Sequence, residues 1–256
     1  MRHRVIVTRP AREAVRWVDD LCAAGFDARA LPLIAIEPVG HAARTALLAA
    51  RRRIGDYAVL MFVSAAAVEH FLVPAAAHIA MPRAWGTGPG TVRALRRAGV
   101  PAACIDAPPG DAASFDSEAL WDIVRAQIGA GTRVLIVRGG DARGRPAGRD
   151  WLAREIDAAG GVVDTVVAYR RLAPTLDVGA LALAAAGAGD GTVWLFSSSE
   201  AIANLRQAMP AADWAAARAV ATHARIAEAA RAAGFGTVRL ASAGLAALTA
   251  SIESFT

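Results

Sequence analysis

Small polar and basic residues stand directly after the short apolar runs of this 256-residue chain, where they could bind anions. They are Thr8 and Arg9, Ser64, Thr87 and Gly88, Arg138, Gly139 and Gly140, Ser197 and Ser198, and Thr222 and His223. If the apolar runs are parallel strands, these residues lie at carboxyl ends, beside helix N-termini that attract carboxylates. Each is equally an ordinary helix cap, and Ser197 stands at capping-box spacing from Glu200. Together they favour a site for a small polyanionic ligand.

Tyr169 is the second candidate for chemistry. It is one of two tyrosines, and it lies in an extended stretch directly before Arg170 and Arg171. Two interpretations stay open: an edge-strand aromatic with its hydroxyl in water, or a phenol that donates a proton to a substrate. His223 is a third candidate, because imidazole can donate or accept a proton, although its place at a helix start explains it equally well.

Residues that are missing or isolated exclude several kinds of chemistry. All 28 basic residues are arginine, which excludes a Schiff-base lysine, a P-loop lysine and pyridoxal chemistry. Cys22 and Cys104 are isolated, and the five histidines lack metal-ligand spacing, so we expect no disulfide, no metal and no cofactor. The turn at 86–91 resembles a dinucleotide fingerprint, but Thr91 replaces its third glycine. A nucleotide-dependent enzyme is therefore the weakest interpretation.

Composition and charge predict a cytoplasmic protein. The chain is 55% hydrophobic, yet no apolar stretch approaches the roughly 18 residues that cross a membrane. It turns polar at Thr8 before the apolar region of a signal peptide can form. The net charge of +5 is spread along the chain, whereas nucleic-acid-binding proteins concentrate theirs. We expect no membrane partner, no nucleic-acid partner and a monomer.

The elements that must position these residues alternate between strands and helices. Predicted strands are 5–8, 57–63, 84–87, 103–106, 134–137, 193–196, 219–222 and 238–241. Predicted helices are 11–24, 43–53, 65–72, 90–98, 117–129, 149–159, 177–187, 199–208, 224–233 and 244–252. Strands that are apolar throughout indicate parallel sheets covered by helices on both faces. Two long extended stretches, 28–39 and 162–172, interrupt the alternation as edge strands or as connectors between domains.

The two halves of the chain repeat each other. Residues 61–68 match 195–202, the stretch 87–99 matches 222–234, and the opening strand and helix match those that begin near Leu135. Three matches in the same order predict two similar domains. We expect the ligand in a cleft between them, as small molecules often bind between domains.

These motifs resemble the uroporphyrinogen-III synthases in order and spacing across essentially the whole chain. The motifs of the first half are Val7–Pro10, Leu31–Ile34, Phe62–Val68, Gly88–Thr91 and Ser117–Leu120. Those of the second half are Val137–Gly139, Gly148–Arg149, Tyr169–Arg171, Phe196–Ser198 and Thr222–Ala227.

The resemblance implies an α/β fold of two similar parallel-sheet domains, joined by a two-strand antiparallel connector with the active cleft between the domains. Residues 1–39 with 173–256 would form one domain, including the first connector strand. Residues 40–161 would form the inserted domain, and 162–172 the second connector strand.

The implied reaction closes hydroxymethylbilane, which carries eight carboxylates and a hydroxymethyl group, into uroporphyrinogen III with loss of water and inversion of the last pyrrole. This is a lyase reaction that needs no metal or cofactor. Tyr169 would assist departure of the hydroxyl group. Substrate binding is expected at Thr8, Arg9, Ser64, Gly88, Thr91, Ser117, Arg138, Gly139, Arg149, Ser197, Ser198, Thr222 and His223.

One departure and one alternative accompany the resemblance. Where many family members keep a Gly-Pro-x-Thr turn in the second half, this chain has His223-Ala224-Arg225-Ile226, so a hydroxyl role at that turn is in doubt. The competing interpretation is a non-enzymatic two-domain protein that binds a small polyanion. Such a protein has no need of Tyr169 and binds without turnover.

Overall fold

The computed structural model describes residues 3–72, 81–112, 114–242 and 244–255. The chain folds into two compact units. Unit 1 comprises Met1–Ala35 and Leu172–Thr256, and unit 2 comprises Ile36–Arg171.

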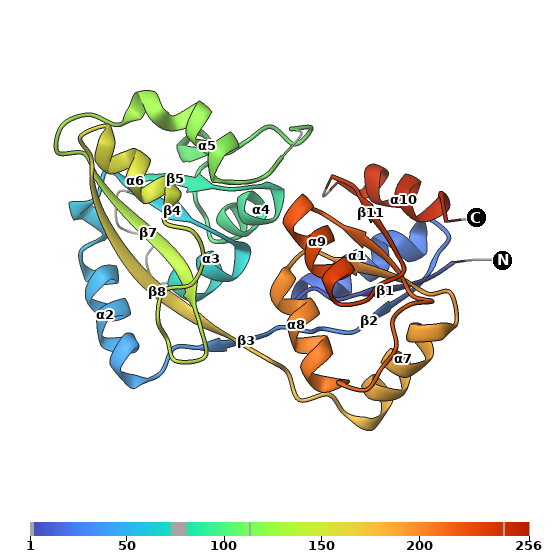
Figure 1. Cartoon of the computed structure of the whole chain (residues 1–256). Coiled ribbons are helices and arrows are strands. Elements are labelled where there is room, and N and C mark those ends of the chain that lie inside the picture. The colour runs from blue at the N-terminus through green and yellow to red at the C-terminus, as the bar shows by residue number, and fades with distance from the viewer. Residues whose placement is uncertain (1–2, 73–80, 113, 243, 256) are drawn as a thin grey trace. The chain divides into compact units, whose positions relative to one another are not determined.

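Unit 1 is a five-stranded sheet with helices on both faces (Figure 1). Its strands are β1 (Arg4–Val7), β2 (Asp27–Ala30), β9 (Val193–Phe196), β10 (Arg218–Ala221) and β11 (Thr237–Leu240). Its helices are α1 (Ala11–Ala23), α7 (Val178–Gly189), α8 (Ser199–Ala208), α9 (Ala224–Ala232) and α10 (Leu245–Glu253). The strand order is β11-β10-β9-β1-β2, and every pairing is parallel.

Unit 2 is a six-stranded sheet of the same kind. Its strands are β3 (Ala35–Pro38), β4 (Val59–Phe62), β5 (Arg83–Gly86), β6 (Ile105–Asp106), β7 (Arg133–Gly140) and β8 (Val162–Leu172). Its helices are α2 (His41–Arg52), α3 (Ala65–Phe71), α4 (Pro89–Arg97), α5 (Ser117–Val124) and α6 (Trp151–Ala158). The order is β3-β8-β7-β4-β5-β6, and the pairings from β8 to β6 are parallel.

Every predicted strand and helix is present, with boundaries that differ by a few residues. The extended stretch at 28–39 forms two strands, β2 in the sheet of unit 1 and β3 in the sheet of unit 2. Pro32 lies between them and has no N–H to donate, which favours a break in the pairing. The stretch at 162–172 is β8, which pairs along β7 and lies beside β3 (Figure 1).

The internal repeat of the sequence is also a repeat of topology. The sequence matches relate β4 to β9, β5 to β10 and β7 to β1. Written in corresponding strands, unit 2 reads β8-β7-β4-β5-β6 and unit 1 reads β2-β1-β9-β10-β11. The two orders are identical, and β3 is an addition at the edge of unit 2. The predicted pair of similar parallel α/β domains is confirmed.

Alternate residues of each central strand pack against helices on opposite faces. In unit 2, Leu60 and Phe62 pack with α2, α3 and α4, whereas Val59 and Met61 pack with α5 and α6. In unit 1, Val5 and Val7 pack with α1 and α10. Because both faces are covered, the strands are apolar at every position. No helix among the described residues is long and apolar enough to cross a membrane.

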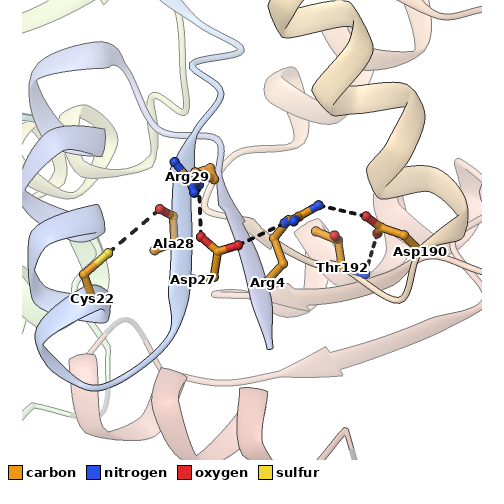
Figure 2. A network of polar contacts seen from close by, with 7 residues as sticks. All are labelled: Arg4, Cys22, Asp27, Ala28, Arg29, Asp190 and Thr192. Atoms are coloured by element: carbon orange, nitrogen blue, oxygen red, sulfur yellow. Dashed lines mark hydrogen bonds and ion pairs between the residues drawn. The ribbon is translucent and has the colours of Figure 1, made fainter. Parts of the chain in front are cut away.

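An arginine near the N-terminus links three parts of unit 1. Figure 2 shows Arg4 between Asp27 and Asp190, with N···O distances of 3.1 Å to each carboxylate. Arg29 also pairs with Asp27, at 3.0 Å. Asp190 accepts a hydrogen bond from the backbone N–H of Thr192, just before β9. The network ties the first residues of β1 to those of β2 and β9.

A second polar cluster ties together the beginnings of three strands in unit 2. Tyr57 donates its hydroxyl hydrogen to Asp164 at 2.9 Å, and Arg133 pairs with the same carboxylate oxygen at 2.8 Å. The Arg133 guanidinium also lies 5.2 Å from the Tyr57 ring centroid. The hydrogen bond from Arg133, followed by that from Tyr57, lowers the pKa of Asp164.

We expect Asp164→Asn to lower the free energy of unfolding at pH 7 by about 0.2–1 kcal/mol, the range for partly exposed ion pairs. The pKa of Asp164 is depressed in the folded state, so its stabilisation is present above the unfolded pKa of about 4 and is lost as pH falls through the folded pKa. Urea unfolding between pH 7 and pH 2 measures this, and the difference from wild type should narrow towards the acid end. A difference that does not change with pH contradicts the assignment.

Candidate functional site

The carboxyl ends of four neighbouring strands in unit 2 bring several predicted site residues to one edge of the sheet. Ser64 follows β4, Gly88 follows β5, Gly139 lies near the end of β7, and Tyr169 lies near the end of β8. The strands β8, β7, β4 and β5 are consecutive in the sheet and parallel. Residues from four separate parts of the sequence therefore meet at one place.

Ser64 and Tyr169 are joined directly. Their hydroxyl oxygens lie 3.0 Å apart, and either one can be the donor. Ser64 Oγ also accepts the backbone N–H of Ala67 at 3.1 Å, as the cap of α3. Tyr169 is 4% exposed, and its ring centroid lies 5.8 Å from that of His70. The phenol is thus buried, with its hydroxyl held at the entry of α3, so the open-water interpretation of Tyr169 is wrong.

Gly139 lies directly under the Tyr169 ring. Its pairing partner across β7 and β8 is Tyr169 itself, next to a register shift between Arg138 and Gly139. A Cβ atom on Gly139 would lie 2.6 Å from Tyr169 Cζ, closer than real Cβ contacts allow. The absence of a side chain at position 139 leaves the space that the ring fills.

Gly88 and Thr91 form the first turn of α4. Gly88 is the N-cap and offers no side-chain cap, while Pro89 occupies the first helical position. A Cβ atom on Gly88 would meet the Phe115 side chain at 3.1 Å. Thr91 is 4% exposed, with its methyl carbon against Gly86. The backbone at this helix start, more than the buried Thr91 side chain, is available to an anion.

Two arginines predicted to bind carboxylates are already paired. Arg138 is 5% exposed, and it bonds to Asp150 at 2.6 Å and to the carbonyl oxygen of Arg149 at 3.1 Å. Arg149 is exposed and forms a two-pronged ion pair with Glu118, which raises the arginine pKa. Glu118 follows Ser117, the first residue of α5. Arg138 therefore holds the loop before α6, and Arg149 links that loop to α5.

In unit 1, Thr8 and Arg9 follow β1 and are also engaged within the unit. The Thr8 hydroxyl is buried and donates to the carbonyl oxygen of Leu195 at 2.7 Å. Arg9 pairs with Glu13 at 3.1 Å, and its guanidinium carbon lies 4.8 Å from the Trp17 ring centroid. Burial lowers the pKa of Arg9, against the opposing effect of Glu13.

The remaining predicted residues of unit 1 lie at the starts of two helices. Ser198 caps α8 and accepts the backbone N–H of Glu200 at 3.3 Å, so the cap falls one residue after Ser197. His223 caps α9 by accepting the backbone N–H of Arg225 on its Nδ1 at 3.2 Å. Thr222 is the residue before this cap. The parallel pairing of β1, β9 and β10 brings these residues to the same sheet edge as Thr8.

Sequence reasoning missed several described residues that contact the candidate site of unit 2. Among them are Asp150, Glu118 and His70. Asp150 and Glu118 directly follow the predicted residues Arg149 and Ser117. An acidic residue next to each predicted residue could have indicated them as ion-pair partners. His70 lies in the last turn of α3, and no pattern in the sequence relates it to Tyr169. In the described ranges, no group of three or more His, Cys, Asp or Glu side chains could hold a metal ion.

Comparison with known proteins bears on the whole chain. Residues 15–249 match the sequence model of the family described as uroporphyrinogen-III synthase HemD. A mutant uroporphyrinogen III synthase from the extremely thermophilic bacterium Thermus thermophilus matches with a TM-score of 0.53 and 16% identity, over 99% of this chain and 98% of that one. The uroporphyrinogen-III synthetase from Helicobacter pylori matches with a TM-score of 0.59 and 13% identity, over 100% of both chains. At these identities the two structures bear on the fold alone.

The contacts of Arg138 give a prediction about stability. We expect Arg138→Met to lower the free energy of unfolding by about 1–3 kcal/mol, because two hydrogen bonds from a charged donor are lost. The loop at 141–150 should also become more sensitive to trypsin. Arg149→Gln is the matched control, and loss of its exposed ion pair should cost about 1 kcal/mol or less. Equal, small effects of both changes would show that Arg138 does not hold the loop.

Proposed function

The chain belongs to the uroporphyrinogen-III synthase family, and from this premise we propose that the Tyr169 edge of unit 2 is where its substrate reacts. Membership makes the protein an enzyme of haem biosynthesis. We propose further that it is a lyase without a cofactor and that its substrate is hydroxymethylbilane. Uroporphyrinogen-III synthase is also the function predicted from the sequence.

The reaction consists of one dehydration and one ring closure. A proton reaches the oxygen of the terminal hydroxymethyl group, the C–O bond breaks, and water leaves as the pyrrole nitrogen lone pair forms an azafulvene cation. The substituted carbon of the last pyrrole attacks this electrophile to give a spiro intermediate. That intermediate breaks the original bond between its spiro carbon and the methylene bridge to the third pyrrole, which leaves a second azafulvene cation there. The unsubstituted α carbon of the last pyrrole then bonds to this methylene carbon, so that the ring closes with the pyrrole inverted. The final carbon loses one proton, so the balance is substrate to product plus one water.

Tyr169 is the residue that we assign as the proton donor. The observation that carries this assignment is its 3.0 Å hydrogen bond to Ser64, which keeps the phenol hydroxyl at the carboxyl edge of the sheet. A phenolate left after donation can take back the proton that the closing ring releases, so the residue is regenerated. General acid catalysis of this kind is typically worth about 10²–10⁴-fold in rate. Binding that holds the flexible substrate in one conformation determines which isomer forms.

The carboxylates of the substrate need several binding groups. We propose the backbone at Gly88, Thr91 and Gly139, the side chains of Ser64 and Ser117, and the exposed guanidinium of Arg149. Arg138 would contribute by holding the loop that carries Arg149. In unit 1 we propose Ser197, Ser198, Thr222 and His223 as binding groups, with Thr8 and Arg9 holding the chain after β1 behind them. The non-enzymatic binding interpretation has no support in the family match or in the matched structures.

An assay of isomer composition tests the function. We expect the purified protein, given freshly generated hydroxymethylbilane without metal or nucleotide, to yield predominantly uroporphyrinogen III. Unaided closure gives the uninverted isomer I, so the product ratio separates enzyme from background. Isomer I alone, formed at the rate of the protein-free blank, would remove the assignment.

Replacement of the phenol tests the catalytic role of Tyr169. We expect Tyr169→Phe to fold normally, to keep its KM within about threefold, and to lose about tenfold or more in kcat. The lower limit of this loss is smaller than the usual effect of a general acid, because water can substitute as the proton donor. Tyr57→Phe is the matched control: it removes the other phenol hydroxyl, which bonds to Asp164 at the opposite ends of the strands. We expect its kcat to be unchanged. Full turnover and full isomer III selectivity in Tyr169→Phe would mean that its hydroxyl is structural.

A further inference from the structure

We propose that Gly139 and Ser64 are positioning residues for this reaction, because together they determine where the Tyr169 hydroxyl points. We call Gly139, Ser64 and the irregular pairing beside Gly139 the Tyr169 seat. The inference rests on the proposed role of Tyr169 as proton donor and extends it to two residues that need not touch the reacting atoms.

The irregular pairing decides on which face of the sheet Tyr169 lies. Arg138 pairs with Val167, but the next residue, Gly139, pairs with Tyr169, so Ala168 is an extra residue in β8. In a regular strand, neighbouring side chains point to opposite faces. Here Ala168 and Tyr169 both pack in the core that lies under α2, α3 and α4. The bulge therefore turns Tyr169 towards α3, and bulges commonly redirect side chains in this way.

The missing side chain of Gly139 makes the redirected position possible. A Cβ atom there would lie 2.6 Å from Cζ, 2.7 Å from Cε2 and 2.8 Å from the hydroxyl oxygen of Tyr169. All three atoms belong to the hydroxyl end of the ring. An alanine would therefore push away the part of the side chain that carries the acidic proton.

Ser64 then fixes the direction of the hydroxyl. The cap bond from Ala67 N–H holds Ser64 Oγ at the start of α3, and Tyr169 Oη lies 3.0 Å from this fixed oxygen. If Ser64 donates, the phenol can donate its own hydrogen to the substrate oxygen. If Tyr169 donates, the substrate oxygen must replace Ser64 as the acceptor. In both cases the phenol oxygen has a defined place, which general acid catalysis requires within hydrogen-bonding reach of the leaving group.

Two glycine variants separate the seat from general damage to the fold. Gly139→Ala is compared with Gly129→Ala, because a Cβ atom on Gly129 meets no atom within 4 Å. We expect Gly139→Ala to lose about tenfold or more in kcat with KM within about threefold, and Gly129→Ala to match wild type. Introduced into Tyr169→Phe, Gly139→Ala should cause less than about a twofold further loss, because it acts through a hydroxyl already removed.

The two tyrosines allow a readout independent of activity. The chain labelled with ¹³C at tyrosine Cζ should give two signals, which Tyr57→Phe assigns. We expect Gly139→Ala to shift the Tyr169 signal and to leave that of Tyr57 in place. An unchanged Tyr169 signal would overturn the proposed contact.

Ser64 variants test the seat if Gly139→Ala does not fold. Ser64→Ala should lose about fivefold or more in kcat, and Ser64→Thr, which keeps the hydroxyl, should recover most of it. Asp177→Ala is the control for loss of a cap alone, because Asp177 caps α7 by accepting the backbone N–H of Ala180. Full kcat in Gly139→Ala or Ser64→Ala, with Tyr169→Phe impaired, would overturn the seat alone. Full kcat in Tyr169→Phe as well would overturn the proton-donor assignment and the seat together.

Discussion

The parallel pairing of β7 with β8 is the constraint on which the candidate site of unit 2 depends. It runs from Arg133 opposite Val162 to Gly140 opposite Arg170, along almost all of both strands. Its far end is tied by the Tyr57, Arg133 and Asp164 cluster, and its near end carries Tyr169. β7 ends in two glycines, and side chains of β8 occupy the space that their Cβ atoms would need. A Cβ atom on Gly140 would lie 2.8 Å from Val167, and one on Gly139 would meet the Tyr169 ring. Any change in this register would move the phenol away from Ser64.

The repeated topology of the two units shows what duplication preserved and what it did not. Ser64 and Ser198 are equivalent in the repeat, and both cap the helix after their strand. Arg9 lies two residues after β1, and Arg138 lies near the end of β7. Each pairs with an acidic residue and buries an Nε that has no partner among the described residues. An arginine held in this way is rigid and expensive to desolvate, so it more readily supports a loop than exchanges partners with a ligand.

Much of the fold was predictable because it depends on local pattern. Fully apolar runs such as Val193–Phe196, in alternation with helical patterns, indicate strands covered on both faces. The Ala-Ala-Gly endings mark the turns after helices. Less of the site was predictable. The bulge beside Gly139 depends on packing between side chains distant in sequence. The burial of Arg138, whose ion-pair partner Asp150 is itself exposed, leaves no signal in a count of charges. The split of 28–39 into strands of two sheets was ambiguous, because an extended stretch does not reveal its pairing partners.

The helix starts differ between the units in a way that bears on anion binding. Gly88 and His223 are equivalent in the repeat. At α9 the His223 imidazole accepts a hydrogen bond from the backbone N–H of Arg225, so that this N–H is not available to an anion. At α4 no side chain of the described residues caps the helix, and Pro89 has no N–H. Unpaired donors and the helix dipole attract a carboxylate most strongly where no side-chain acceptor competes. The α4 start, on the same sheet edge as Tyr169, is therefore better suited to the proposed binding of a carboxylate than its counterpart in unit 1.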